Sequence, residues 1–158
     1  SLIINIGRIK SREIIVYNSP KNTAMQLISG RKNYVVSQHL IESDINTFNL
    51  INKTKLKLKL TPPIYITKED TLIDDFLFAK KGIIIFEGKS ILFKNNISKL
   101  PKTISPDYII NPNQFQELKN PIFKNAIIIT NKKFIQKENS FLTRIHQTSK
   151  EGAFTKKW

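Results

Sequence analysis

The chain has 158 residues, of which 40% are hydrophobic, and this content suits one compact domain with a core of its own. Lysine and arginine together number 26 against 12 acidic residues, so the formal net charge is +14, which favours contact with a polyanion. The absence of cysteine excludes disulfides, thiolate catalysis and cysteine-ligated zinc. No apolar run approaches the roughly 20 residues that span a bilayer, so we expect this chain by itself to be soluble.

The positive charge has two explanations, and both stay open. Of the basic residues, 22 are lysine, and the chain is also rich in isoleucine and asparagine, a surplus that AT-rich coding produces without any selection for binding. Arginine, the better bidentate partner of phosphate, is scarce.

The first half of the chain predicts a locally formed sheet. Residues 2–9 alternate weakly around Gly7 and predict an edge strand that pairs with residues 14–17. Three apolar runs follow at residues 14–17, 24–28 and 34–36, separated by turns that contain Pro20 and Gly30. Because proline fixes φ and glycine accepts positive φ, both connections favour chain reversal, and the pattern predicts a three-strand meander.

After the meander, the spacing of Ile41, Ile45, Phe48 and Ile51 predicts a short helix over residues 42–52, with Ser43 or Asp44 as its cap and a loop as the alternative. Residues 55–60 then read KLKLKL, a period of two that predicts a strand with leucines on one face and lysines on the other. Such lysines either follow the phosphates of a nucleic acid or protect an edge strand from aggregation. Residues 62–63 are prolines that end this strand, and residues 64–66 resume it.

Residues 68–75 hold the acidic cluster of the chain, formed by Glu69, Asp70, Asp74 and Asp75. Paired carboxylates can hold a divalent ion, but without nearby histidines or an EF-hand pattern a solvated loop or capped turn is the favoured interpretation. Residues 83–93 predict a hairpin around Gly88.

The second half of the chain predicts shorter elements. A strand is expected within residues 106–112, a brief helix at residues 114–119, an apolar strand at residues 125–130 and a helix at residues 134–142. Gly152 can supply a turn conformation that a β-carbon would penalise, and residues 155–158 are expected to form a basic tail.

Two segments carry a resemblance to a known family. Residues 16–32 contain VYN, PK, TA and SGRK in the order and spacing of one branch of ComEC-family DNA-uptake channel proteins, in their soluble C-terminal domain. Residues 144–154, and residues 148–154 most strongly, are similar to the closing segment of that domain, and this similarity implies a strand and a turn that lead to a last strand. The resemblance implies an α+β fold of mainly antiparallel sheet, a truncated metallo-β-lactamase-like core with few short helices. It also implies that residues 1–158 are a single domain from the C-terminal end of a larger inner-membrane protein, on the periplasmic side.

The resemblance does not extend to a catalytic site. The chain has only two histidines, His39 and His146, and no HxHxDH sequence, and Asn111-Pro112 stands where catalytic relatives carry a pair of histidines. No GxSxG, Walker or GxGxxG motif is present. We therefore expect no catalytic residues, no metal site and no cofactor, with a metal-dependent nuclease as the weaker alternative.

Two non-enzymatic functions remain open. In the first, the domain contacts single-stranded DNA, with tyrosines Tyr34, Tyr65 and Tyr108 available to stack on bases. The candidate DNA contacts are Lys55, Lys57, Lys59, Lys80, Lys81, Arg31 and Lys32. In the second, the domain is structural and docks on the membrane channel portion of its own protein or on another subunit.

Overall fold

The structure is a computed structural model that describes residues 11–93, 105–113, 115–133 and 144–158. The chain divides into two compact units. Unit 1 consists of Ser1–Lys68 and Ala153–Trp158, and unit 2 consists of Glu69–Gly152. Each unit is described by itself below, and the expectation of a single domain stays a prediction.

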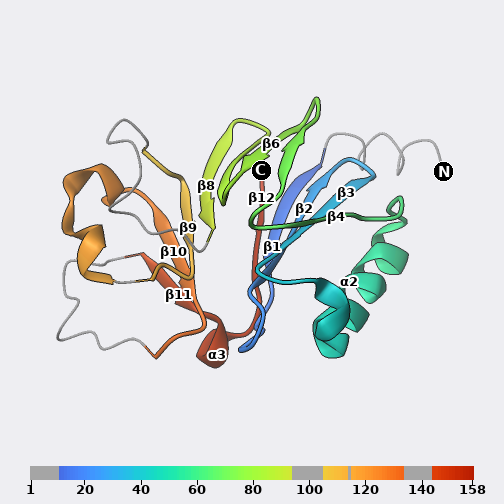
Figure 1. Cartoon of the computed structure of the whole chain (residues 1–158), viewed down its shortest axis with the longest axis horizontal. Coiled ribbons are helices and arrows are strands. Elements are labelled where there is room, and N and C mark those ends of the chain that lie inside the picture. Colours follow the sequence, from blue (N-terminus) through green and yellow to red (C-terminus); the bar gives the residue numbers. More distant parts are fainter. Residues whose placement is uncertain (1–10, 94–104, 114, 134–143) are drawn as a thin grey trace. The chain divides into compact units, whose positions relative to one another are not determined.

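Unit 1 is built on a five-stranded sheet with the order β12-β1-β2-β3-β4 (Figure 1). Its strands are β1 (Arg12–Val16), β2 (Ala24–Ser29), β3 (Lys32–Ser37), β4 (Ile64–Thr67) and β12 (Phe154–Lys157). Neighbouring strands from β12 to β3 are antiparallel, whereas β4 runs parallel to β3. The predicted three-strand meander is therefore confirmed as β1, β2 and β3.

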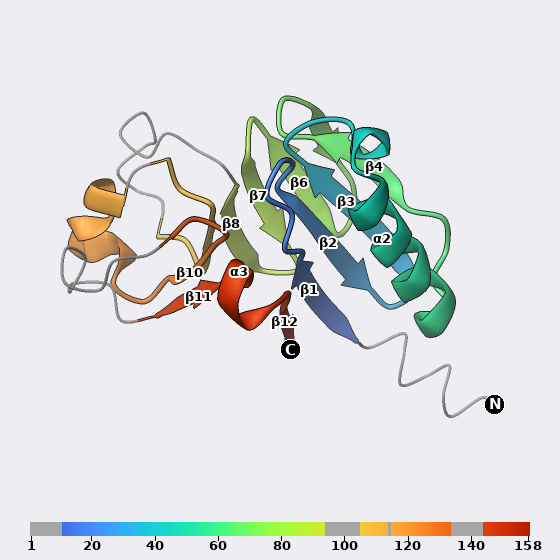
Figure 2. The same ribbon diagram turned by 90° about the horizontal axis from the view of Figure 1, so that it is seen from below.

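Helix α2 (Ile45–Leu58) makes the crossover that the parallel pair of β3 and β4 requires, after a short 3-10 helix η1 (Ile41–Ser43). Figure 2 shows α2 running along the sheet. Ile51 of α2 is fully buried, and the half-buried Phe48 and Leu58 pack on the same cluster. The sheet contributes to this cluster the side chains of Ile15, Tyr17, Ala24, Ile28 and Val35.

The strand predicted at residues 55–60 is wrong, because residues 45–58 are helical and Lys59 ends the helix in the left-handed conformation with φ 54°. Leucine and lysine are good helix formers, and six alternating residues do not outweigh an apolar helix face that begins at Phe48. The leucines consequently differ in burial: Leu56 is 73% exposed and Leu60 is buried. The predicted cap at Asp44 is confirmed, although the helix extends beyond residue 52.

A buried polar layer lies between α2 and the meander. The Tyr17 hydroxyl donates to Oε1 of Gln26, whose Nε2 donates to Oδ1 of Asn33 at 2.7 Å. The Tyr17 hydroxyl also lies 3.3 Å from Oγ1 of Thr54 on α2. One hydrogen-bonded chain thus links β1, β2 and β3, and its first member also contacts the helix.

Unit 2 contains a seven-stranded mixed sheet with the order β11-β10-β9-β8-β7-β6-β5. Its strands are β5 (Thr71–Ile73), β6 (Leu77–Lys80), β7 (Ile83–Phe86), β8 (Lys89–Phe93), β9 (Tyr108–Ile110), β10 (Ile127–Thr130) and β11 (Ile145–Gln147). The helices are the 3-10 segments η3 (Phe115–Lys119) and η4 (Pro121–Phe123) and the single turn α3 (Thr148–Glu151). Strands β5 to β8 are antiparallel, and β8 to β11 are parallel.

The predicted elements of the second half are largely confirmed. The 83–93 hairpin is β7 and β8, and the predicted strands at 106–112 and 125–130 contain β9 and β10. The helix expected at 114–119 is the 3-10 segment η3, and the two strands expected in the closing segment are β11 and β12, with α3 and Gly152 between them. Unit 1 and unit 2 together form an α+β protein of mainly sheet with few short helices, as predicted.

Two predictions of irregular structure are wrong. The acidic loop at residues 68–75 contains the short strand β5, because three residues between the two acidic pairs suffice to pair with β6. The basic tail at residues 155–158 contains most of β12, which pairs with β1, and the Trp158 amide donates to the Arg12 carbonyl at 3.1 Å. The strand expected at residues 2–9 and the helix expected at 134–142 lie outside the described residues.

None of the helices in the described part of the chain is long and apolar enough to cross a membrane.

The polar layer under α2 makes the first testable prediction. Burial raises the pKa of Tyr17 to about 12, with the neighbouring Glu13 adding to the rise and the hydrogen bond with Thr54 opposing it. A raised pKa means that the folded state favours the neutral phenol. The stabilisation is therefore complete below the ordinary pKa of 10.0 and is lost as the pH rises through about 12. Urea unfolding at a series of pH values should show a smaller loss of stability over this window for Tyr17→Phe than for the parent.

At neutral pH the same variant should lose about 1–3 kcal/mol, since Gln26 is left with an unpaired buried acceptor. Equal pH profiles for the two proteins would contradict the assignment.

Candidate functional site

Five of the seven predicted DNA contacts gather at one end of unit 1, which we call the basic end. Arg31 lies in the turn between β2 and β3, and Lys32 is the first residue of β3. Lys55, Lys57 and Lys59 occupy the last turn and C-cap of α2. Arg31 Nε donates to the Lys59 carbonyl at 3.1 Å, and the Thr61 amide donates to the Arg31 carbonyl at 2.9 Å. The turn and the helix end are therefore held together.

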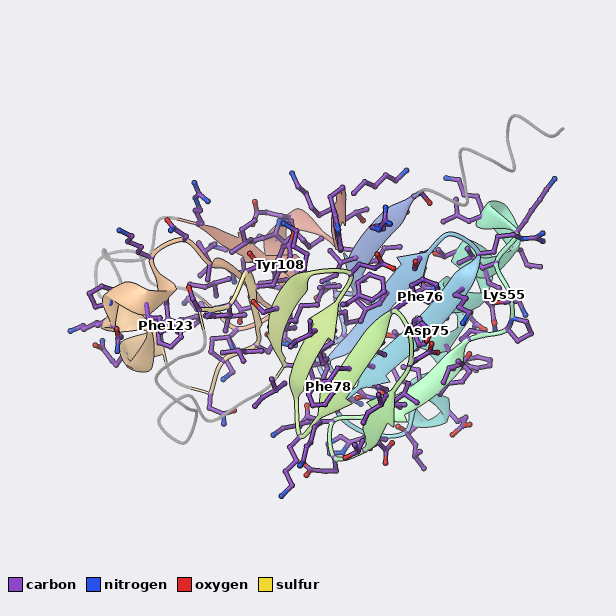
Figure 3. The ribbon with its side chains drawn as sticks, turned by 90° about the horizontal axis from the view of Figure 1, so that it is seen from above. Lys55, Asp75, Phe76, Phe78, Tyr108 and Phe123 are labelled. Carbon is purple, nitrogen blue, oxygen red and sulfur yellow. The ribbon has the colours of Figure 1, made fainter. Side chains whose placement is uncertain are left out.

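The lysines of α2 do not form the flat row that a strand would give. Lys55 and Lys59 are four residues apart, whereas Lys57 points to a different side of the helix. Cations in the last helical turn also interact favourably with the negative end of the helix dipole, which gives these lysines a structural role in addition to any contact with a ligand. Lys55 is labelled on α2 in Figure 3.

The other predicted contacts are placed differently. Lys80 and Lys81 lie at the β6–β7 turn of unit 2, and Lys81 has φ 48°. Of the tyrosines proposed to stack on bases, Tyr34 and Tyr108 are buried, so the prediction is wrong for both, because each fills the core from within a strand. Tyr65 is 41% exposed and stacks on Phe48 of α2 with 6.4 Å between ring centroids.

A cavity of about 510 Å³ lies at the opposite end of α2, where the chain enters the helix. Its walls come from the β1–β2 turn, from His39, which lies two residues after β3, and from the residues around the start of α2. The lining residues are Asn18, Ser19, Pro20, Lys21, Asn22, His39, Ser43, Asp44, Ile45, Asn46 and Thr47.

Asn22 fixes one wall of this cavity. Its Oδ1 accepts from the His39 amide at 2.9 Å, while its Nδ2 donates to the His39 carbonyl at 3.1 Å. The Ser37 hydroxyl also donates to the His39 carbonyl. The backbone of His39 is held on both sides, and its exposed side chain lines the cavity.

Asp44 fixes the other wall. Its Oδ1 accepts from the Thr47 amide at 3.3 Å, and its Oδ2 accepts from the hydroxyls of Ser19 and Thr47. Partial desolvation opposes ionisation, but the hydrogen bonds from Ser19 and Thr47 and the nearby Lys21 outweigh it and lower the pKa of Asp44. Asp44 is therefore an ionised helix cap that ties α2 to the β1–β2 turn.

The cavity presents one carboxylate, one imidazole and one ammonium group among neutral donors and acceptors. Across residues 11–93, 105–113, 115–133 and 144–158, no group of three or more His, Cys, Asp or Glu side chains is placed to hold a metal ion. The second histidine, His146, lies in unit 2, where its Nε2 is 2.8 Å from the Gly152 carbonyl. Polar side chains thus line the cavity together with apolar surface, and the prediction of no metal site stays a prediction.

Sequence reasoning did not find this cavity. It identified the turn around Pro20 and the cap at Asp44 separately, but 25 residues separate Ser19 from Asp44 and no motif joins them. Ser19 and Asp44 come together because the meander brings the β1–β2 turn and the C-terminal end of β3 to the same end of the sheet.

The comparisons with known proteins concern almost the whole chain. The family model described as the ComEC C-terminal domain matches residues 14–158. No curated protein and no solved structure matches. The resemblance to a metallo-β-lactamase-like core accordingly stays a prediction.

Asp44 carries the testable prediction for this site. Asp44→Ala removes the cap and leaves Ser19 and Thr47 without their acceptor, so the protein should lose about 1 kcal/mol, and Asp44→Asn should lose less because an amide oxygen still caps. Because the pKa of Asp44 is lowered, its contribution is present above the ordinary value of 3.8 and disappears as the pH falls through the lower folded value. Urea unfolding at pH 7 and pH 3 measures both effects. A gap between parent and alanine variant that does not narrow at pH 3 would disprove the ionised cap.

Proposed function

Because this chain belongs to the ComEC C-terminal domain family, which points to a role in competence DNA uptake, we propose that it is a non-catalytic accessory domain that contacts single-stranded DNA during internalisation. The domain would act on the periplasmic side of the inner membrane, next to the membrane channel portion of its own protein. In this proposal the domain acts by contacting DNA, and the basic end is the surface that would make the contact.

The single observation in favour is the gathering of five cations on two hydrogen-bonded segments. The Arg31 side chain donates to the Lys59 carbonyl, so the charged residues of the β2–β3 turn and of the end of α2 are held next to one another. A cluster of this kind neutralises several phosphates at once and releases their counterions, whatever the sequence of the bases. The formal net charge of +14 strengthens this attraction at long range.

Two features support weak, sequence-independent binding over base recognition. Four of the five cations that define the basic end are lysines, whereas arginine is the main reader of guanine. Tyr65 and Phe48 stack on each other, and the half-exposed Tyr65 ring offers a single platform for a base. The domain would therefore guide a strand along the channel without selecting it.

A non-catalytic role is proposed from the sequence. The chain has no cysteine and two histidines, and these two histidines belong to different units of the fold. A dinuclear hydrolase needs a cluster of histidines and carboxylates that neutralises two cations, and the HxHxDH sequence that supplies it is missing.

The DNA prediction uses the salt dependence of binding. Replacing Lys55, Lys57 and Lys59 together by glutamine should weaken binding to a fluorescently labelled oligothymidine and flatten the log-log salt slope by about two units, since each phosphate contact on a single strand contributes about 0.7. Fluorescence anisotropy over a range of salt concentrations measures both changes.

The matched control carries Lys124→Gln, Lys133→Gln and Lys150→Gln, which remove the same charge from exposed positions of unit 2. If both triple variants change the slope equally, net charge and not the basic end is responsible. If the Lys55, Lys57 and Lys59 variant matches the parent, these lysines act only as helix-terminal charges and the proposal fails.

The metal prediction tests the non-catalytic part separately. Protein purified without chelator should carry less than about one-tenth equivalent of zinc or manganese by elemental mass spectrometry, judged against the ligand sets that these ions require. Stoichiometric metal that a chelator removes would refute it.

A further inference from the structure

The exposed face of the β5–β7 hairpins in unit 2 carries a continuous apolar row. Ile73 is 74% exposed, Phe78 is 37% exposed and Ile85 is 50% exposed. Ile73 pairs with Phe78 across β5 and β6, and Phe78 pairs with Ile85 across β6 and β7. Three large side chains therefore stand next to one another on adjacent strands, and Phe78 can be followed in Figure 3.

The same face of the sheet is covered elsewhere. On β8, β9 and β10 the side chains of Leu92, Ile109 and Ile128 pair in register and are buried. Leu118, Phe115 and Phe123 of η3 and η4 pack on this cluster, which ends at the half-buried Ile83 of β7. The apolar row is thus the uncovered continuation of a hydrophobic face, and exposed apolar rows of this kind mark interaction surfaces.

Among the described strands, β5 also gives the row an open sheet edge. It is the last strand in the order of the seven-stranded sheet. The Asp74 amide donates to the Leu77 carbonyl at 2.8 Å, so Asp74 and, two residues earlier, Leu72 turn their backbone groups toward β6. Thr71 and Ile73 alternate with them and turn their amide and carbonyl groups toward the edge.

The charge next to this edge is opposite to that of the molecule. Glu69 and Asp70 precede β5, and Asp74 and Asp75 follow it, so four of the 12 acidic residues of a chain with charge +14 flank one three-residue strand. Lys80 is the cross-strand partner of Thr71 and adds a positive charge beside β5, and Lys81 follows it in the β6–β7 turn, so the four carboxylates still outnumber these two lysines. Carboxylates at both ends of β5 disfavour DNA, anionic lipid and the β5 edge of a second copy, and they favour a basic partner.

We propose that strand β5 and the apolar row accept an extended, lysine- or arginine-rich segment of a partner protein, which adds as a further strand at this edge. Its backbone would pair with Thr71 and Ile73, alternate apolar side chains would pack beside Ile73 and Phe78, and its basic side chains would meet the four carboxylates. Main-chain pairing supplies affinity in this binding mode, and the side chains supply selectivity.

A fluorescein-labelled peptide of alternating lysine and valine, seven residues long, is the probe. With the whole chain it should give saturable anisotropy that weakens with salt, and a peptide with glutamate in place of lysine should not bind. A lysine–valine peptide whose alternate amides are N-methylated on the pairing side should lose about tenfold or more in affinity, because it cannot form the added strand.

The variants separate the two parts of the surface. Phe78→Ser should weaken binding about tenfold, while Glu69→Gln combined with Asp75→Asn should weaken it and reduce its salt dependence. Leu56→Ser is the matched control, since Leu56 is 73% exposed but lies on α2 of unit 1. Circular dichroism shows whether each variant is folded, and the charge variant keeps the test valid if Phe78→Ser is not.

Three results would overturn the proposal. The first is no saturable binding up to about 1 mM peptide. The second is equal binding by the N-methylated peptide or by the folded Phe78→Ser and charge variants. The third is attachment to vesicles of phosphatidylcholine and phosphatidylglycerol that Phe78→Ser abolishes, without peptide binding, which would assign the row to a lipid surface.

Discussion

The hydrogen-bonded chain from Tyr17 through Gln26 to Asn33 is the constraint on which unit 1 depends. Gln26 is fully buried at the centre of the meander, so a shift of β2 by one residue would turn its amide to the other face and break its hydrogen bonds with Tyr17 and Asn33. Hydrophobic residues on both faces of β2 give no such preference, because Met25 and Leu27 on one face are as buried as Ala24 and Ile28 on the other. The polar layer therefore sets the register of the sheet, and Thr54 extends it to α2.

The placement of α2 separates unit 1 into two chemically different ends. The helix begins at the cavity, where Asp44 caps the positive end of its dipole, and it finishes at the basic end, where lysines meet the negative end. Each end is joined to a turn of the meander: Asp44 accepts from Ser19 of the β1–β2 turn, and the Lys59 carbonyl accepts from Arg31 of the β2–β3 turn. The two ends of α2 thus place a cavity lined by polar side chains and a cationic surface at opposite ends of the strands of the same sheet.

Local signals predicted most of the fold. Turns at Pro20, Gly30 and Gly88 separated the strands of the meander and of the 83–93 hairpin, because those pairings depend on a few neighbouring residues. The KLKLKL segment was mispredicted because its alternation is a local pattern, whereas its secondary structure depends on tertiary packing. Ile51 and Phe48 pack in the core cluster of unit 1, and this packing favours one continuous helix over residues 45–58. Sequence also could not show that Tyr34 and Tyr108 are buried, or that Ser19 meets Asp44, since both depend on how distant strands are ordered.

Strand β12 has a consequence for how the protein is made. It adds an edge strand to the sheet of unit 1 by pairing Phe154–Lys157 with β1. In the amino-acid sequence, the residues of unit 2 therefore stand between two neighbouring strands of the sheet of unit 1. Unit 2 follows β1 and precedes β12 along the chain, so β12 can pair with β1 only after the residues of unit 2 have been synthesised. Pairs as distant in sequence as Glu13 and Lys157 raise the contact order, which slows folding.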